Sequence, residues 1–130
     1  EAEEKAKKEA EEKAKAEAEE KAKKEAEEAA KKAAETVSQK NAIRAAENYL
    51  NFTAFSKSGL IDQLEYEGYS NADATYAVNN IEVDWNEQAV KAAQNYLNFT
   101  AFSRSGLIDQ LKYEGYTTEQ ATYAVNQVGL

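Results

Sequence analysis

The chain of 130 residues contains no cysteine, histidine, methionine or proline. Without cysteine and histidine it can form no disulfide framework, no zinc or haem site of the usual kind, no thiol nucleophile and no Ser-His-Asp triad. It also has no run of about 18 apolar residues, so no segment is predicted to span a bilayer. These absences exclude a disulfide framework, a zinc knuckle and a membrane-spanning segment within these residues.

The balance of charge is acidic. Sixteen Lys and Arg stand against 24 Asp and Glu, which gives a formal net charge of −8. Such a charge disfavours duplex DNA and anionic membranes and suits a neutral or basic partner. There is no apolar signal-peptide core and no initiator Met at Glu1. We therefore expect a mature, trimmed or engineered fragment whose targeting signal lies outside it.

Residues 1–36 contain only Glu, Lys and Ala, apart from Thr36, in a period of eight such as EAEEKAKK (1–8). Each of the ten lysines in this segment has a Glu four residues earlier, the favoured orientation for an ion pair along a helix. Ala, Glu and Lys are also strong helix formers. The segment is therefore predicted to be helical.

This helix is not expected to have a partner. Equivalent positions of an eight-residue repeat drift by about 80° on an α-helix, so the alanines form a spiral and no heptad seam. We interpret residues 1–36 as a solvated helical spacer of up to about 50 Å, at 1.5 Å per residue. The alternative is a charged low-complexity tail without function.

Residues 37–130 contain a tandem duplication. Residues 42–81 align without a gap to residues 89–128, and 29 of the 40 positions are identical. Solenoids usually need three or more repeats, so two copies favour a pseudo-symmetric pair. About 45 residues are marginal for an independent core, and we expect the two copies to share apolar surface.

Each copy is predicted to form three short helices. The first has its apolar face around Ala46, the second begins at Ser56 or Ser58 and stops at Gly68, and the third begins at Ser70. With no proline and no alternating strand pattern, the predicted fold class is all-α. The predicted domains are the spacer (1–36), the first repeat (37–82) and the second repeat (83–130).

Aromatic residues are expected mainly in the core. This includes most of the eight tyrosines, and the four phenylalanines are assigned to the core by default: Phe52, Phe55, Phe99 and Phe102. Between the copies, Asp84 with Glu87 predicts a helix cap. Trp85 beside it is a candidate wedge between the repeats, or alternatively a residue that packs only against that cap.

The segment NYLNFTAFSKSGLIDQLEYEG (48–68), its second copy and both ATYAV motifs resemble the host-cell-surface-exposed lipoprotein family, the Ltp family. The resemblance covers residues 42–128, and a charged spacer before the repeats suits the family layout. It implies helix-turn-helix-like repeats in an extracytoplasmic protein tethered to the membrane by lipid. It also implies superinfection exclusion, in which the entry of incoming phage DNA is blocked by engaging a phage tail component such as the tape measure protein. The family's lipid-modified Cys and signal peptide are absent, so a soluble, unanchored form is expected.

A helix-turn-helix unit usually suggests DNA binding, but the charges argue against it here. Residues 37–130 hold 11 acidic and 6 basic residues, a net charge of −5. The two candidate recognition helices, 70–80 and 117–127, contain no Lys or Arg. Because phosphate contacts supply most non-specific affinity, we expect no nucleic acid partner.

An acidic face that carries tyrosine is the predicted protein-binding surface. At 100° per residue Tyr66 lies about 200° from Leu64, towards solvent. Carboxylates steer a basic partner, and an exposed tyrosine is a typical interface anchor. The simplest alternative is a solvated helix face with no partner. The candidate residues are Asp62, Glu65, Tyr66 and Glu67 in the first copy and Asp109, Tyr113 and Glu114 in the second.

An enzyme is not predicted. Asp62 and Asp109 are duplicated carboxylates, but no sequence feature brings them together, and there is no Gly-rich phosphate loop or EF-hand loop. We expect no cofactor and no metal. The predicted molecule is a monomer that binds a phage tail protein, with the tape measure protein suspected. The alternative is a generic cell-surface adhesion or scaffold module with a host-protein ligand.

Overall fold

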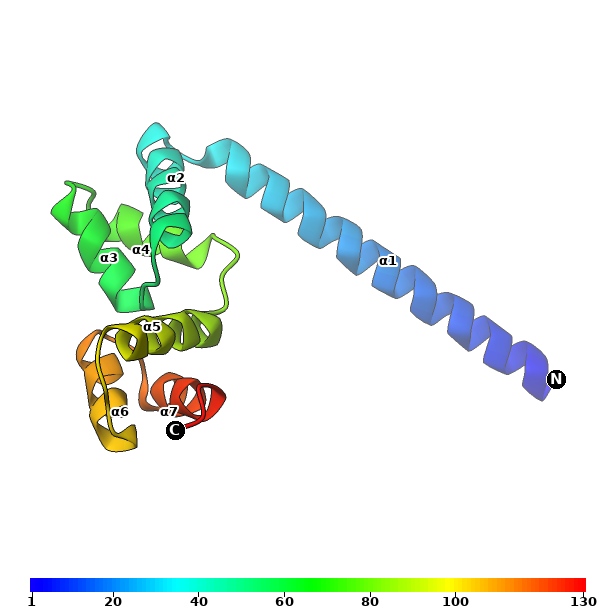
Figure 1. The fold of residues 1–130 in the computed structure, drawn as a ribbon. Coiled ribbons are helices and arrows are strands. Elements are labelled where there is room, and N and C mark those ends of the chain that lie inside the picture. The colour runs from blue at the N-terminus through cyan, green and yellow to red at the C-terminus, as the bar shows by residue number, and fades with distance from the viewer. The chain divides into compact units, whose positions relative to one another are not determined.

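The computed structural model describes all of residues 1–130 and contains seven α-helices and no strand (Figure 1). The all-α class and the tandem arrangement predicted from the sequence are thereby confirmed. The chain divides into two compact units, Glu1–Thr36 and Val37–Leu130. The helices are α1 (Ala2–Ala34), α2 (Val37–Phe52), α3 (Lys57–Tyr66), α4 (Asn71–Asn79), α5 (Trp85–Phe99), α6 (Arg104–Tyr113) and α7 (Thr118–Gln127).

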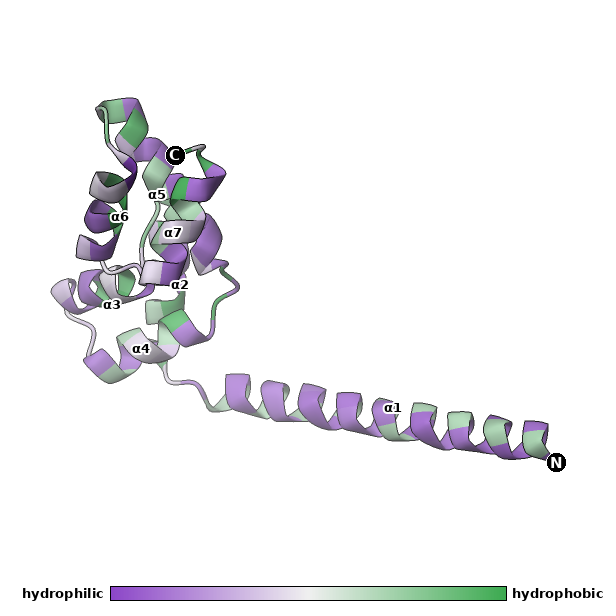
Figure 2. Ribbon diagram, turned by 90° about the horizontal axis from the view of Figure 1, so that it is seen from below, coloured by the Kyte–Doolittle hydropathy of each residue, from purple (hydrophilic) through white to green (hydrophobic).

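The first unit is a single uninterrupted helix, α1, in which no residue is buried. Glu3 and Glu4 lie in its first turn, and Lys31 and Lys32 lie in its last. The charges at both ends therefore interact favourably with the helix dipole. Figure 2 shows hydrophilic residues along the whole of α1, with alanines scattered between them. The helix therefore has no apolar seam for a partner, as its eight-residue period predicts.

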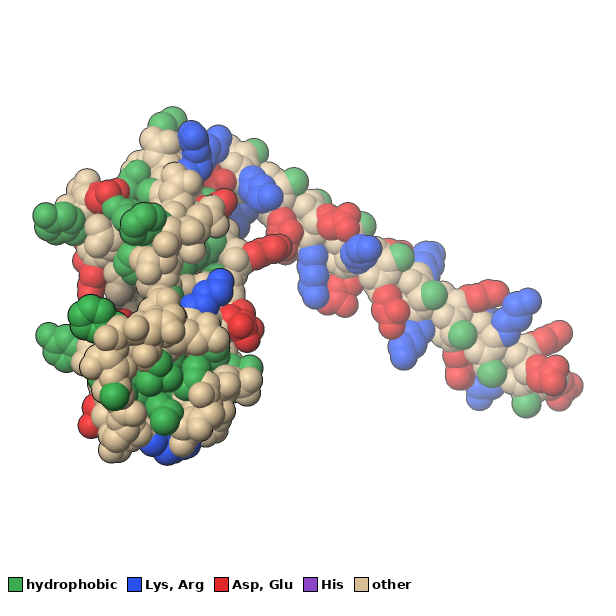
Figure 3. All heavy atoms as spheres, in the orientation of Figure 1, with side chains coloured by type: hydrophobic (Ala, Val, Ile, Leu, Met, Phe, Trp, Pro, Cys, Tyr) green, Lys and Arg blue, Asp and Glu red, His purple; other side chains and the backbone are tan.

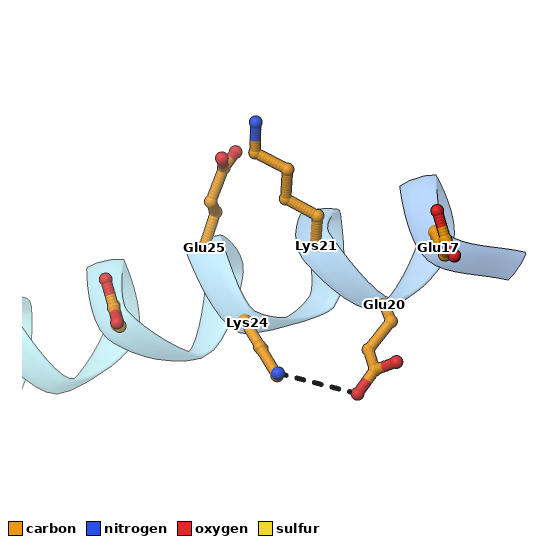
Figure 4. A pocket seen from close by; sticks show the side chains of 6 residues that line it. Glu17, Glu20, Lys21, Lys24 and Glu25 are labelled. Atoms are coloured by element: carbon orange, nitrogen blue, oxygen red, sulfur yellow. Dashed lines mark ion pairs between the residues drawn. The ribbon is translucent and has the colours of Figure 1, made fainter. Parts of the chain in front are cut away.

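A hollow on α1 lies between the side chains of Glu17, Glu20, Lys21 and Lys24 and those of the next turn (Figure 4). Lys24 Nζ lies 3.5 Å from Glu20 Oε1, an ion pair of the predicted spacing. Both side chains are about 69% exposed. Such a pair stabilises the folded state little, and side chains of one helix cannot enclose a ligand. The hollow is a feature of a solvated surface and not a binding site.

The second unit contains two three-helix repeats, α2–α4 and α5–α7 (Figure 1). In the first, α4 packs against α2 and α3, and α7 has the same contacts with α5 and α6 in the second. Each repeat has its own core, in which two leucines of the middle helix are completely buried among alanines of the flanking helices. These leucines are Leu60 and Leu64 in α3, and Leu107 and Leu111 in α6.

Hydroxyl caps begin the short helices, and glycines follow α3 and α6. Ser56, and not Ser58, is the N-cap of α3, because its Oγ accepts a hydrogen bond of 2.9 Å from the N–H of Gly59. Ser70 caps α4 in the same manner. After α3 the chain turns at Gly68, which has a φ of 107° that a residue with a Cβ rarely adopts. These positions agree with the sequence prediction.

The junction between the repeats is formed by one segment from each side. Trp85, the first residue of α5, packs against the core of the first repeat, as the wedge interpretation predicts. In the other direction Ala54 packs against the core of the second repeat, and the N–H of Phe55 donates to Gln88 Oε1 at 3.2 Å. The side chain of Asp84 caps α5 through two backbone N–H groups, as predicted.

Two of the four phenylalanines are not in the core, so that part of the prediction is wrong. Phe52 and Phe99, the last residues of α2 and α5, are 86% and 88% exposed. The other two, Phe55 and Phe102, pack against the cores. At 100° per residue Phe52 lies about 120° from Ala46, which faces the core, and this rotation carries its ring into solvent.

Candidate protein-binding surface

The two tyrosines predicted to face solvent do so. Tyr66 is 86% exposed and Tyr113 is 87% exposed, each as the last residue of its helix. Asp62 and Asp109, one turn earlier, are also exposed. The remaining tyrosines are at least partly covered: Tyr116 is buried, Tyr49, Tyr69, Tyr76 and Tyr96 are half-buried, and Tyr123 is 37% exposed.

The carboxylates that flank these tyrosines are engaged within the protein. The hydroxyl of Tyr49 in α2 donates to the carboxylate of Glu67, and Gln63 Nε2 donates to the same hydroxyl at 3.3 Å. Glu65 accepts a bond of 2.7 Å from Asn71 Nδ2 at the start of α4. Two of the acidic candidates therefore also hold helices of the repeat together.

The second repeat reproduces the tyrosine contact. The hydroxyl of Tyr96 donates to the carboxylate of Glu114, and Gln110 Nε2 donates to that hydroxyl at 3.2 Å. The pKa of Tyr96 is raised above its ordinary value, first by burial and then by this hydrogen bond. For Tyr49 the hydrogen bond to Glu67 is the leading cause of the raised pKa, because tyrosinate beside a carboxylate is disfavoured.

An open groove lies beside each of these contacts. In the first repeat it is lined by Ala45, Asn48, Tyr49, Phe52 and Glu67. The equivalent five residues, offset by 47, line a groove in the second repeat: Ala92, Asn95, Tyr96, Phe99 and Glu114. The second groove has two further lining residues, Thr53 and Ala54, which come from the first repeat. The duplication has thus produced one surface twice, and its edge is covered in one copy only.

The structure brings together some of the predicted residues and adds others. Glu67 and Glu114 each share a groove with an exposed phenylalanine, whereas Asp62 and Asp109 line neither groove. Sequence reasoning missed Phe52 and Phe99, although their position off the apolar face of each first helix was a usable signal. Figure 3 shows hydrophobic side chains standing out from the surface of the repeats, in contrast with the alternating charges of α1.

This surface consists of exposed aromatic rings and carboxylates. No cluster of acidic side chains could hold a metal ion. Every buried side-chain polar atom has a hydrogen-bond partner, so no orphaned buried group marks a small-molecule site. No helix is both long and apolar enough to cross a membrane. What the repeats present to solvent is large aromatic rings beside carboxylates, a combination typical of protein interfaces.

The model of one family, host cell surface-exposed lipoprotein, matches the chain twice, at residues 38–81 and 84–128. The chain belongs to this family. The two matches coincide with the two three-helix repeats and leave out α1. Members of the host cell surface-exposed lipoprotein family are, by that description, proteins of the cell surface.

A solved structure has the same fold. It is the structure of Ltp, a superinfection exclusion protein from the Streptococcus thermophilus temperate phage TP-J34, to which this chain is similar with a TM-score of 0.67 and 32% sequence identity. The similarity covers 74% of this chain and 98% of that one. No curated protein sequence matches the chain.

Proposed function

We propose that the protein acts in superinfection exclusion at the outer face of the cell membrane. The observation that carries this proposal is the similarity to the exclusion protein of phage TP-J34 over almost the whole of that chain. Membership of a surface-exposed lipoprotein family supports the location. A lipid anchor holds the full-length protein at the membrane, and α1 acts as a spacer between the anchor and the repeats.

The proposed mechanism is capture of a phage tail component, with the tape measure protein as the suspected target, so that injection of the incoming DNA is blocked. The protein works as a binding module without catalysis. The net charge of −5 on residues 37–130 supports a basic protein segment as the target and disfavours nucleic acid. The exposed rings of Tyr66 and Tyr113 supply contact area beside that charge.

A challenge experiment tests the proposed function. Cells that display the anchored protein are infected with related phages, and adsorption and DNA entry are measured separately. Normal adsorption with blocked DNA entry supports exclusion at injection. Blocked adsorption would instead indicate that the protein masks a receptor, and an unchanged infection would favour the adhesion or scaffold module.

A binding experiment tests the proposed surface. Tyr66→Ala together with Tyr113→Ala is expected to weaken binding of the full chain to tail-tip or tape-measure fragments by tenfold or more, the loss of one or two interface anchors. Because both rings are exposed, the helical signal and the unfolding midpoint are expected to stay unchanged. Thr118→Ala, at an exposed position of α7, is the control. Unaltered binding by the double variant would show that the tyrosines are not part of the interface.

Salt provides a second measure of the same interaction. Interactions between exposed charges are screened beyond about 10 Å at 0.1 M salt. An acidic surface that attracts a basic partner should therefore lose affinity for it as the salt concentration rises. We expect binding to the tail fragment to weaken steadily up to several hundred millimolar salt. Binding that does not respond to salt would contradict the electrostatic part of the proposal.

A further inference from the structure

The contact between the two repeats uses different surfaces on its two sides. Residues 53–58 of the first repeat dock on the end of α6: Ser56 Oγ donates to the carbonyl of Glu114 at 2.6 Å, and Ser58 Oγ donates to that of Gly115 at 3.3 Å. Residues 100–105 of the second repeat have almost the same sequence, TAFSRS against TAFSKS. In this structure they make no equivalent contact, because the Ser103 hydroxyl bonds only to its neighbours Ser105 and Gly106. An interface between unlike surfaces leaves one free half at each end.

Burial shows that both free halves are uncovered. Ser56 is only 3% exposed in its docked segment, whereas the equivalent Ser103 is an exposed residue. On the receiving side Ala92 is 5% exposed, but the equivalent Ala45 of the first repeat is half-buried. The chain therefore carries an unused docking segment on its second repeat and an unused receiving surface on its first.

The turn glycines give an independent measure of the same difference. A methyl group built on Gly115 would lie 2.7 Å from Ser56 Oγ, because the docked segment covers that corner. A methyl group on Gly68, which has nearly the same φ, would meet nothing within 4 Å. The receiving corner at residues 67–68 thus has the backbone geometry of the occupied one and open space in front of it.

We propose that residues 100–105 of one chain dock on residues 67–68 and the adjoining groove of a second copy, so that chains associate head to tail. In this contact Ser103 takes the place of Ser56: it caps its own helix through Gly106 N–H and donates its hydroxyl hydrogen to the carbonyl of Glu67. Because the two surfaces differ, each bound chain leaves one docking segment and one receiving surface free, and the assembly can extend to more than two chains.

The charges favour the contact between chains. The docking segment of the second repeat carries Arg104. The receiving helix end of the first repeat carries Glu65 and Glu67, where the second repeat has Lys112 and Glu114. The first repeat therefore has a glutamate where the second has a lysine, and this makes its receiving side more complementary in charge to a basic segment.

Two residues that strengthen the contact within the chain are missing from the contact between chains. Trp85 and Gln88 support the contact within the chain. The equivalent positions of the first repeat, which would take part in the contact between chains, hold Ser38 and Asn41. The contact within a chain also benefits from a short covalent connection, which supplies an effective concentration in the millimolar range. The association between chains is therefore weak, consistent with a monomer in dilute solution, and becomes relevant where copies are crowded on a surface.

Sedimentation equilibrium of the full chain tests the proposal. The average mass of the wild type should rise above one protomer as its concentration is raised from about 10 µM to about 1 mM, the range expected for a weak contact. The double variant Ser38→Trp/Asn41→Gln completes the receiving surface at two exposed positions, and it should associate at a concentration at least tenfold lower. If the average mass of both the wild type and this variant stays that of one protomer at all concentrations, the proposal is overturned.

Variants with one blocked end separate this contact from other kinds of self-association. In the strengthened background, Ser103→Asp keeps an N-cap but removes the hydroxyl donor, and Asn48→Arg obstructs the receiving groove. Each should remain a monomer alone, while an equimolar mixture should form dimers and nothing larger. The matched control Thr117→Asp makes the same change at the N-cap of α7 and should associate like its parent.

Two results would contradict the proposed contact. If Ser103→Asp and Thr117→Asp reduce association equally, the effect is one of charge and not of docking. If a tape-measure or tail-tip fragment binds at residues 67–68, as mapped by NMR shifts, while the chain alone shows no self-association, the receiving surface belongs to that partner and not to a second copy.

Discussion

The two turn glycines provide a test of the junction between the repeats, because the same substitution can be made at both. Gly68 and Gly115 have φ values of 107° and 105°, a region that disfavours a side chain. Alanine at either position should destabilise the fold by about 1–2 kcal/mol for this backbone alone. The gain from a less flexible unfolded chain is the same at both positions and cancels in their comparison.

Gly115→Ala should destabilise the protein more than Gly68→Ala. The added methyl group lies 2.7 Å from Ser56 Oγ, so this hydroxyl must turn away. Movement breaks the hydrogen bond from Ser56 to the carbonyl of Glu114, which stabilises by about 0.5–1.5 kcal/mol. We therefore expect a total of about 2–3 kcal/mol for Gly115→Ala, about 1 kcal/mol more than for Gly68→Ala.

Urea unfolding followed by tryptophan fluorescence measures this difference, since Trp85 is the one tryptophan and lies at the junction. Ser58 also stands close to the position of the new methyl group. Combining Gly115→Ala with Ser58→Ala should therefore recover part of the loss, a coupling that independent sites would not show. Equal destabilisation by the two glycine substitutions, without recovery, would refute the assignment of residues 114–115 to the contact between repeats.

Three further outcomes follow from burial and from the pKa shifts. Leu111→Ala should lower the free energy of unfolding by about 2–5 kcal/mol, since Leu111 is completely buried, and a smaller loss in urea unfolding would indicate a loose core. Phe52→Ala and Phe99→Ala should each change that free energy by less than about 0.5 kcal/mol, and a larger loss would place the ring in a contact. The pKa of Tyr116 is raised above 10.0, first by burial. The buried, neutral Tyr116 therefore contributes fully to the stability of the fold below pH 10, and this contribution is lost as the pH rises above 10. The thermal midpoint should therefore fall more steeply above pH 10 in the wild type than in Tyr116→Phe; parallel profiles would contradict this.

The parts of the fold that depend on local interactions were predictable from the sequence. The caps at Ser70 and Asp84 and the turn at Gly68 follow from neighbours within a few residues. The long helix α1, Ala2–Ala34, follows from propensity and from the Glu-to-Lys spacing. Even the choice between Ser56 and Ser58 is decided by the N–H of Gly59, three residues along the chain from the capping serine.

The parts that depend on contacts across the chain were not predictable in the same way. The hydroxyl of Tyr49 reaches Glu67, 18 residues later, and thereby turns a candidate partner-binding carboxylate into one that also joins two helices. Phe52 was assigned to the core because phenylalanine usually lies there. That rule ignores the direction in which a side chain in the last turn of the helix points. The bond from Ser56 to Glu114 spans 58 residues, and no local signal marks it.

The two repeats also show why equal sequence does not imply equal function. Their middle helices are nearly identical, yet Ser56 is buried and Ser103 is exposed, because in this structure only the first of the two segments docks on another repeat. In the same way Ala45 in the groove of the first repeat is half-buried, while its equivalent Ala92 is 5% exposed in a groove that Thr53 and Ala54 also line. It follows that substitutions at Asn48 should affect partners, whether a tail protein or a second copy, more than the same substitutions at Asn95.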